Sequence, residues 1–161
     1  MANFYINTIR NDKRFNSEER IDDINLLEPV TRKIVQNIIE QARLNGLELM
    51  VFETYRSQQR QALLYAQGAT KLQNVGVHHY GLACDIVKNV GGDPSWKGDF
   101  SLLGQLAYHN KILWGGDWGT PNIKHSFIDD DHVQRCTIGR QAMLFSGMWY
   151  PDSTYDPYQD L

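Results

Sequence analysis

The segment from Asp23 to Leu47 constrains the fold of this chain more than any other part of its sequence. Its apolar residues recur every three or four positions, which is the spacing of one face of an α-helix. Pro29 suits an early turn of such a helix, and Gly46 marks a stop. We therefore predict the longest helix of the chain here. The apolar positions are Ile24, Leu27, Val30, Ile34, Ile38 and Ala42.

Short apolar runs alternate with further helical segments along the rest of the chain. A polar Asn89 to Gly98 segment is predicted to be a loop long enough to border a site, and residues 151–161 are expected to be extended or loosely packed. Helices that precede and interrupt a mostly antiparallel sheet indicate an α+β fold. The predicted strands are Leu47 to Phe52, Leu82 to Val87, Ile112 to Trp118 and His132 to Thr137; the predicted helices are Ser57 to Gln67, Phe100 to Lys111 and a short stretch from Thr137 to Phe145.

Length and charge narrow the class of protein. The 161 residues, of which 42% are hydrophobic and 22% charged, suit one domain spanning 1–161. The net charge is -3 and the 16 Lys and Arg residues are scattered, so we expect no nucleic-acid partner. The N-terminus lacks a signal-peptide pattern and the sequence contains no run of 18 apolar residues, so we expect synthesis in the cytoplasm and no membrane span.

The cysteines do not form a CxxC metal or redox motif. Cys84 and Cys136 are far apart in the sequence, and we expect two buried free thiols. A disulfide stays open as the alternative if the protein works outside the cytoplasm.

A histidine and an aspartate seven positions apart form the strongest local feature. His78 and Asp85 flank Gly81, which permits a turn that leads into an apolar strand. Such a turn brings two side chains together, and zinc accepts imidazole nitrogen and carboxylate oxygen. A catalytic zinc site needs three protein ligands and one position for water. The pair therefore predicts part of a metal site.

His132 is the best candidate for the third ligand because it opens a predicted strand after a run of aspartates. Asp129, three residues earlier across a bend, has the position of a general base that stands near the metal without binding it. An exposed acidic loop, or a group of helix caps, is an equally plain interpretation of Asp129 to Asp131 when the sequence is taken without its relatives.

These motifs resemble those of the zinc metallopeptidases that include phage L-alanyl-D-glutamate endolysins and the D-alanyl-D-alanine peptidases of vancomycin resistance. The family pattern Ser-x-His-x-x-Gly-x-Ala-x-Asp resembles Gly76 to Asp85, and its carboxylate-x-x-His resembles Asp129 to His132. Tyr55 to Gly68 is similar to the helix start that carries the family's substrate-binding arginine, and Trp114 to Trp118 to its Trp-Gly turn. The resemblance covers Glu53 to Gln134 and implies the hedgehog/DD-peptidase fold with a zinc site on the sheet.

Carried over residue by residue, the resemblance implies one Zn²⁺ per chain, held by His78, Asp85 and His132. It implies that Asp129 takes the proton of the attacking water and returns it to the leaving amine, while Arg56 binds substrate and stabilises developing negative charge. Tyr80 and Trp114 are candidates for substrate binding, with Trp118 beside them. Their alternative role is that of core aromatics.

Three positions depart from the family pattern, and three histidines have no counterpart in it. Gly76 stands where the family has serine, and Asp131 and Val133 replace the usual residues beside the last zinc histidine. His79 is expected at the rim or behind the ligands. The remaining histidines, His109 and His125, receive no role.

The resemblance implies a peptidase that cuts the L-alanyl-D-glutamate bond of the peptidoglycan stem peptide. A D-alanyl-D-alanine carboxypeptidase is the close alternative. Such an enzyme, expected as a monomer, would reach the cell wall or periplasm after release through a holin pore or as a delivered toxin. A non-enzymatic zinc-binding module, like hedgehog signalling domains, is the third alternative. Asp129 argues against it, since a binding module needs no base beside its metal.

Overall fold

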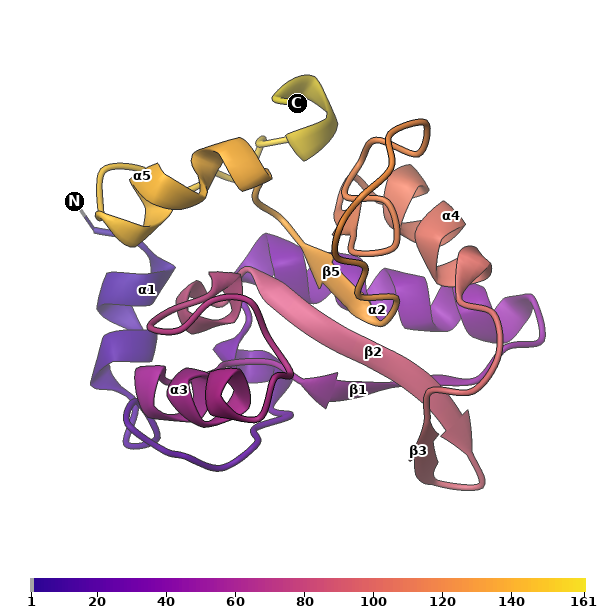
Figure 1. Cartoon of the computed structure of the whole chain (residues 1–161), viewed down its shortest axis with the longest axis horizontal. Helices are drawn as coiled ribbons and strands as arrows, with labels where there is room; N and C mark the ends of the chain where they lie inside the picture. The colour runs from indigo at the N-terminus through magenta and orange to yellow at the C-terminus, as the bar shows by residue number, and fades with distance from the viewer. Residues whose placement is uncertain (1) are drawn as a thin grey trace.

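The computed structural model describes residues 2–161 (Figure 1). The first half of the chain contains α1 (Phe4–Asn7), α2 (Pro29–Leu44), β1 (Leu49–Glu53) and α3 (Gln58–Ala66). The second half contains β2 (Ala83–Val90), β3 (Asp93–Ser95), α4 (Ser101–His109), β4 (Leu113–Trp114), β5 (His132–Gln134) and α5 (Gln141–Phe145). Short 3-10 turns lie at Ile9–Asn11, Ile24–Leu26, Val77–Tyr80, Ile138–Arg140 and Pro157–Gln159.

The strands form one antiparallel sheet in the order β1-β2-β5-β4, and β3 pairs with the far end of β2. The helices α2 and α4 pack against each other and against the same side of this sheet, and β2 crosses in front of α2 (Figure 1). The prediction of an α+β fold with a small antiparallel sheet is therefore confirmed.

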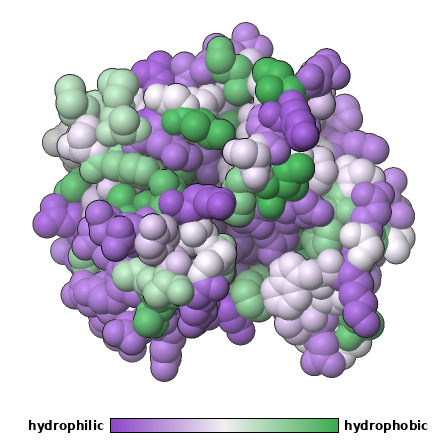
Figure 2. All heavy atoms as spheres, viewed as in Figure 1, coloured by the Kyte–Doolittle hydropathy of each residue, from purple (hydrophilic) through white to green (hydrophobic). Residues whose placement is uncertain are grey.

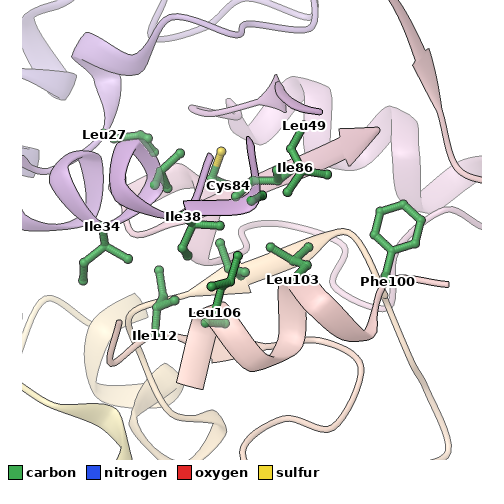
Figure 3. Packing of buried hydrophobic residues seen from close by; sticks show 14 residues of the cluster. Leu27, Ile34, Ile38, Leu49, Cys84, Ile86, Phe100, Leu103, Leu106 and Ile112 are labelled. Atoms are coloured by element: carbon green, nitrogen blue, oxygen red, sulfur yellow. The ribbon is translucent and has the colours of Figure 1, made fainter. Parts of the chain in front are cut away.

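Alternation along the two central strands separates the core from the opposite face of the sheet. Cys84 and Ile86 on β2 pack with apolar side chains of α2 and α4, such as Ile38 and Leu103 (Figure 3). Successive side chains of a strand point to opposite faces, so Asp85 lies on the other face. The face of the sheet that packs against α2 and α4 is thus apolar, and the opposite face carries the ionisable side chain of Asp85.

The long helix begins later than predicted. α2 starts at Pro29 with the Glu28 carboxylate as its N-cap, and the segment from Asp23 forms a separate 3-10 turn. A residue before proline is disfavoured in helical conformation, and Glu28 is accordingly not helical, with ψ 143°. Within residues 2–161, no helix combines the length and apolarity needed to cross a membrane.

The predicted loop from Asn89 to Gly98 is in part a β-hairpin. Val90 pairs with Asp93 across Gly91 and Gly92, both of which have positive φ. Two-residue hairpins require positive φ at both central positions, so the Gly-Gly pair was the signal for this turn. The two last strands are shorter than predicted, because β4 ends at Trp114 and β5 at Gln134.

The C-terminal tail is packed rather than loose. The fully buried Arg135 donates hydrogen bonds from its guanidinium to the carbonyl oxygens of Asp152 and Tyr155. Arg140 pairs with Asp160 at 2.8 Å, and the Tyr158 hydroxyl donates to a main-chain carbonyl just before β4. The sequence analysis did not foresee these contacts, because they involve groups far away in the sequence.

Both cysteines are buried and free, as expected. Cys84 belongs to the core beneath α2, whereas Cys136 lies in a second apolar cluster with Leu82 and Leu144. Burial raises the pKa of the Cys136 thiol to about 12, so it is protonated at neutral pH.

Replacing Gly81 by alanine is expected to destabilise the fold. Gly81 has φ +73°, and a Cβ there would lie 2.8 Å from Ile9 Cδ1 and 2.9 Å from the Leu26 carbonyl oxygen. The left-handed conformation and the crowding together should cost about 2–3 kcal/mol in the free energy of unfolding, measured by urea denaturation. Gly46→Ala is the matched control, since Gly46 has φ +84° and open space around it. Equal losses in the two variants would show that the crowding at Gly81 relaxes freely.

Candidate metal centre

Three side chains that the sequence analysis selected as metal ligands meet on the front face of the sheet. Asp85 on β2 pairs directly with His132 on β5, and His78 lies in the 3-10 turn before β2. Asp85 Oδ1 is 3.2 Å from His78 Nε2 and 3.1 Å from His132 Nδ1. One potential ligand atom from each residue lies within 4.8 Å of the others, and all three residues are buried. This geometry suits a single metal ion.

A main-chain carbonyl orients the ring of His78. His78 Nδ1 lies 2.7 Å from the carbonyl oxygen of Thr54, which can only accept a hydrogen bond. Nδ1 therefore carries a proton, and the nitrogen that faces Asp85, where a metal would bind, is Nε2. Metal-binding histidines are usually held in this way through their other nitrogen.

Gln134 orients the ring of His132. The Gln134 side-chain amide donates from Nε2 to the carbonyl oxygen of Cys136 at 2.7 Å, so its Oε1 faces His132 Nε2 at 2.8 Å. His132 Nε2 must then carry a proton, and the lone pair of the neutral ring lies on Nδ1. The sequence analysis missed Gln134, although strand alternation from His132 places both side chains on one face.

The Asp85 carboxylate is the centre of charge in this site. Burial opposes its ionisation, but the neighbouring positive charge at His78 and hydrogen bonds from both histidines hold the pKa of Asp85 well below its usual range. Burial likewise favours a neutral His132, yet its hydrogen bond to Asp85 and the Asp85 charge raise the pKa of His132 to about 9. A cation held by these three groups would displace protons from the rings.

Arg56 lies behind the second oxygen of Asp85. It follows β1, and Ser57 caps α3 directly after it, as predicted. Arg56 Nη2 lies 2.9 Å from Glu53 Oε1 and 3.3 Å from Asp85 Oδ2, and Nη1 donates to Gln61 Oε1. Its Nε has no hydrogen-bond partner among the described residues. These contacts use one Nη1 hydrogen and both Nη2 hydrogens, and the Nε–H is buried, so one Nη1 hydrogen remains to meet another group.

Asp129 stands beside the three candidate ligands, on the segment between β4 and β5. One carboxylate oxygen each from Asp85, Asp129 and Asp131 lies within 4.8 Å of the others. The Asp129 amide donates to the Gly115 carbonyl oxygen at 2.9 Å, and its own carbonyl accepts from the His132 amide at 3.1 Å. Asp129 is half-buried, which leaves it open to the cleft.

Asp131 is a buried carboxyl group that the sequence analysis treated only as a departure from the family pattern. Burial and the negative charge of Asp85, together with a hydrogen bond to Asp129, raise the pKa of Asp131 to about 8. Trp96 from the β2–β3 hairpin donates to Asp131 Oδ2 at 2.7 Å. The predicted border loop therefore reaches the site through Trp96.

All four of these polar groups, His78, Asp85, Asp129 and His132, open into one cleft of about 510 Å³. The space-filling view of this face shows a hollow with a mostly hydrophilic floor (Figure 2). Aromatic side chains line part of the cleft wall, and they are Phe52, Trp96, Trp118 and Phe127. Ligand clefts commonly combine such apolar walls with a few placed polar groups.

Two aromatic residues predicted to bind substrate lie outside this cleft. Trp114 is paired with Val133, and directly paired residues share a face of the sheet, so Trp114 points toward the core with Val133. Tyr80 lies one 3-10 turn after Val77 and joins it in an apolar cluster that also contains Leu82. Neither residue lines the cleft, and both have the alternative position among core aromatics, whereas Trp118 does line the cleft.

His79 is a buried support rather than a rim residue. Burial lowers the pKa of His79 to about 4, so the ring is neutral. Its Nδ1 donates to the Arg56 carbonyl oxygen at 3.1 Å, and its Nε2 lies 2.9 Å from the Tyr5 hydroxyl. Of the two histidines given no role, His125 lines the cleft and His109 lies at the end of α4.

Gln61 occupies the space where the family's serine would project. A Cβ at Gly76 would lie 3.2 Å from Gln61 Oε1, the atom that accepts from Arg56. Gln61 Nε2 also donates to Thr70 Oγ1 and to the Leu72 carbonyl oxygen. Where the family has a serine, this chain has Gly76 together with Gln61, which links Arg56 to Thr70 and Leu72 by hydrogen bonds.

Comparison with known proteins gives no match to a family model. The L-alanyl-D-glutamate peptidase of Listeria phage A118 is 28% identical over 116 residues, which cover 70% of this chain and 39% of that protein. The peptidoglycan L-alanyl-D-glutamate endopeptidase CwlK of Bacillus subtilis strain 168 is 29% identical over 111 residues, which cover 57% of this chain and 66% of that protein. The chain thus matches less than two thirds of the length of either relative.

Two solved structures show the same fold. The L-Ala D-Glu endopeptidase ChiX of Serratia marcescens superposes with a TM-score of 0.56 at 21% identity, over 73% of this chain and 90% of that one. The vancomycin resistance D,D-pentapeptidase VanY, solved in complex with Zn(II), gives a TM-score of 0.50 at 17% identity, over 67% and 71%.

Proposed function

We propose that this chain, a relative of the L-alanyl-D-glutamate peptidases with the fold of the zinc D,D-peptidases, is a zinc-dependent peptidase of peptidoglycan stem peptides. The observation that carries the proposal is the meeting of His78, Asp85 and His132 at one point, with the Asp129 carboxylate beside them in an open cleft. The bond proposed to be cut is L-alanyl-D-glutamate, the bond in the names of both sequence relatives.

The three candidate ligands fit zinc. Two neutral imidazole nitrogens and one carboxylate oxygen form a donor set that zinc accepts, and three protein ligands are the number found in catalytic sites. Thr54 and Gln134 fix the other nitrogen of each ring, so the nitrogens that would bind the metal already face one point. One zinc ion per chain would therefore be held by His78, Asp85 and His132.

Zinc bound there would supply Lewis-acid polarisation of a carbonyl group and a lower pKa for water. Asp129 is proposed to take the proton of the attacking water. The protonated carboxyl group then hands this proton to the nitrogen of the leaving amine, which completes the exchange. Its half-buried position, near two other carboxylates, suits a group that must carry a proton for part of the cycle.

Arg56 is proposed to stabilise negative charge at the reacting carbonyl or to bind a substrate carboxylate. Glu53, Asp85 and Gln61 hold its guanidinium from three directions, so its position is fixed before substrate arrives. The Nη1 hydrogen that remains could donate a charge-assisted hydrogen bond to such an oxygen. Trp96, Trp118 and Phe127 would then wall the peptide, in place of Tyr80 and Trp114.

The test is digestion of purified peptidoglycan by wild type and Asp129→Asn, with zinc content measured on the same preparations. We expect wild type to hold one zinc ion and to release D-glutamate amino termini, identified by mass spectrometry. The variant should keep its zinc and lose activity by at least about a hundredfold, because general-base catalysis contributes that much.

The other outcomes separate the alternatives. Release of free D-alanine would identify a D-alanyl-D-alanine carboxypeptidase. Zinc binding without cleavage of wall peptides by wild type would favour a non-enzymatic zinc module. An Asp129→Asn variant as active as wild type would remove Asp129 from the mechanism.

A further inference from the structure

We propose that Trp114 is a positioning residue that holds Asp129 in place from the far side of the sheet. This inference rests on the proposed peptidase function, and it gives a role to a residue that does not reach the cleft. The indole N–H of Trp114 donates to the carbonyl oxygen of Asp130 at 2.6 Å. That carbonyl belongs to the peptide bond between Asp130 and Asp131, next to the proposed base.

The Trp114 ring has a fixed position because two glycines hold it. A Cβ at Gly104 on α4 would lie 2.4 Å from Trp114 Cε3, and a Cβ at Gly116 would lie 2.2 Å from Cζ2. Any larger residue at either position would collide with the ring. The indole is therefore packed against the backbone of α4 and of the segment after β4, so its N–H points in one direction.

Residues 115–131, which join β4 to β5, form a loop whose two ends are hydrogen-bonded to each other beside Trp114. Gly115 accepts a hydrogen bond from the Asp129 amide at 2.9 Å and donates one to the His132 carbonyl oxygen at 2.7 Å. A Cβ at Gly115 would lie 2.3 Å from the Asp129 carbonyl oxygen, so this close approach also requires glycine. The Trp114 indole adds a side-chain bond one residue beyond Asp129.

The candidate ligands are held differently from Asp129. His132 belongs to β5, which pairs with β2 on one side and β4 on the other. Asp129 lies outside the strands, and it is held by main-chain hydrogen bonds to Gly115 and His132 and by the Trp114 bond to its neighbour. Loss of the indole N–H should therefore shift Asp129 while the metal ligands keep their places.

The experiment compares Trp114→Phe with Tyr158→Phe. The second variant is the matched control, because Tyr158 lines the same hollow as Trp114 but its hydroxyl donates to the Ile112 carbonyl oxygen, at 3.0 Å, and not to residues 129–131. For Trp114→Phe we expect kcat to fall about ten- to a hundredfold, since small displacements of a catalytic group have effects of this size. KM and the zinc content should stay within about twofold of wild type. Tyr158→Phe should leave kcat unchanged.

Hydrogen–deuterium exchange gives a readout that does not depend on activity. Amides of residues 115–131 should exchange faster in Trp114→Phe than in wild type or Tyr158→Phe. Gly104→Ala is a second way to move the ring, from α4, and it should reproduce the loss of kcat even if Trp114→Phe folds poorly.

The outcomes are distinct from those of the proposed function. If wild type cleaves wall peptides, and Trp114→Phe and Gly104→Ala both keep the kcat and the amide exchange rates of wild type, the positioning role of Trp114 is wrong. Equal loss of zinc and of kcat would assign Trp114 to the structure of the whole site instead. If wild type has no peptidase activity, the proposed function fails, and the exchange measurement still tests whether Trp114 holds the segment.

Discussion

Replacing Asp85 by asparagine is expected to abolish both zinc binding and peptidase activity. The Asp85 carboxylate is the only negatively charged member of the candidate ligand set, and its Oδ1 lies within 3.2 Å of nitrogen atoms of both histidines. Asparagine keeps the shape but removes the charge, and the ligand atom it offers binds zinc poorly compared with a carboxylate. Changes in outer contacts alone cost about 10–100-fold in metal affinity, so the loss of a direct ligand should exceed about a hundredfold.

Zinc titration with a competing chelator, followed by digestion of peptidoglycan, measures both effects. Asp129→Asn is the control, because it removes a charge from the same cleft and should leave zinc affinity nearly unchanged. An Asp85→Asn variant that binds zinc as tightly as wild type would show that the metal lies elsewhere.

The second large effect is expected on stability, from Arg135→Met. The Arg135 guanidinium is fully buried between Glu28, whose carboxylate lies 3.7 Å away, and the carbonyl oxygens of Asp152 and Tyr155. Methionine fills similar space but leaves the buried Glu28 carboxylate without its countercharge and these carbonyl groups without their donor. Breaking a buried pair from one side costs about 3–5 kcal/mol, to be measured by chemical denaturation.

Arg140→Met is the control on the same tail. Arg140 pairs with Asp160 near the surface, so its loss should be far smaller. A double-mutant cycle with Glu28→Gln measures the coupling between Arg135 and Glu28, and the Glu28→Gln single variant accounts for the cap bond that is lost because glutamine keeps only one of the two acceptor oxygens. If Arg135→Met were as stable as wild type, the buried charge would make no net contribution to folding.

Local spacing explains how the predicted groups of the candidate site come together. His78 and Asp85 flank a glycine turn, and Asp129 precedes His132 by three residues, so each pair is brought together by its own segment. The strand pairing of Asp85 with His132 then joins the pairs. The helix cap at Ser57 was predictable for the same local reason.

The residues that were missed depend on how distant segments pack. Trp96 reaches Asp131 only because a hairpin extends β2, and Gln61 reaches Arg56 only because Gly76 leaves room. Trp114 was misplaced because its direction follows from its pairing with Val133, which periodicity within β4 cannot supply. Arg135 shows the same limit, since nothing in its local sequence indicates a buried charge.

The pairing of Asp85 with His132 also concerns how the fold is assembled. These residues are 47 positions apart, on the two strands at the centre of the sheet. An ion that binds both acts as a cross-link between β2 and β5, and its binding free energy adds to the stability of that pairing. The apolar layer beneath α2 and α4 lies on the opposite face and would need no such link. A bound metal and the apolar core would thus stabilise the β2–β5 pairing from opposite faces of the sheet, and a loss of stability on one face could be compensated on the other.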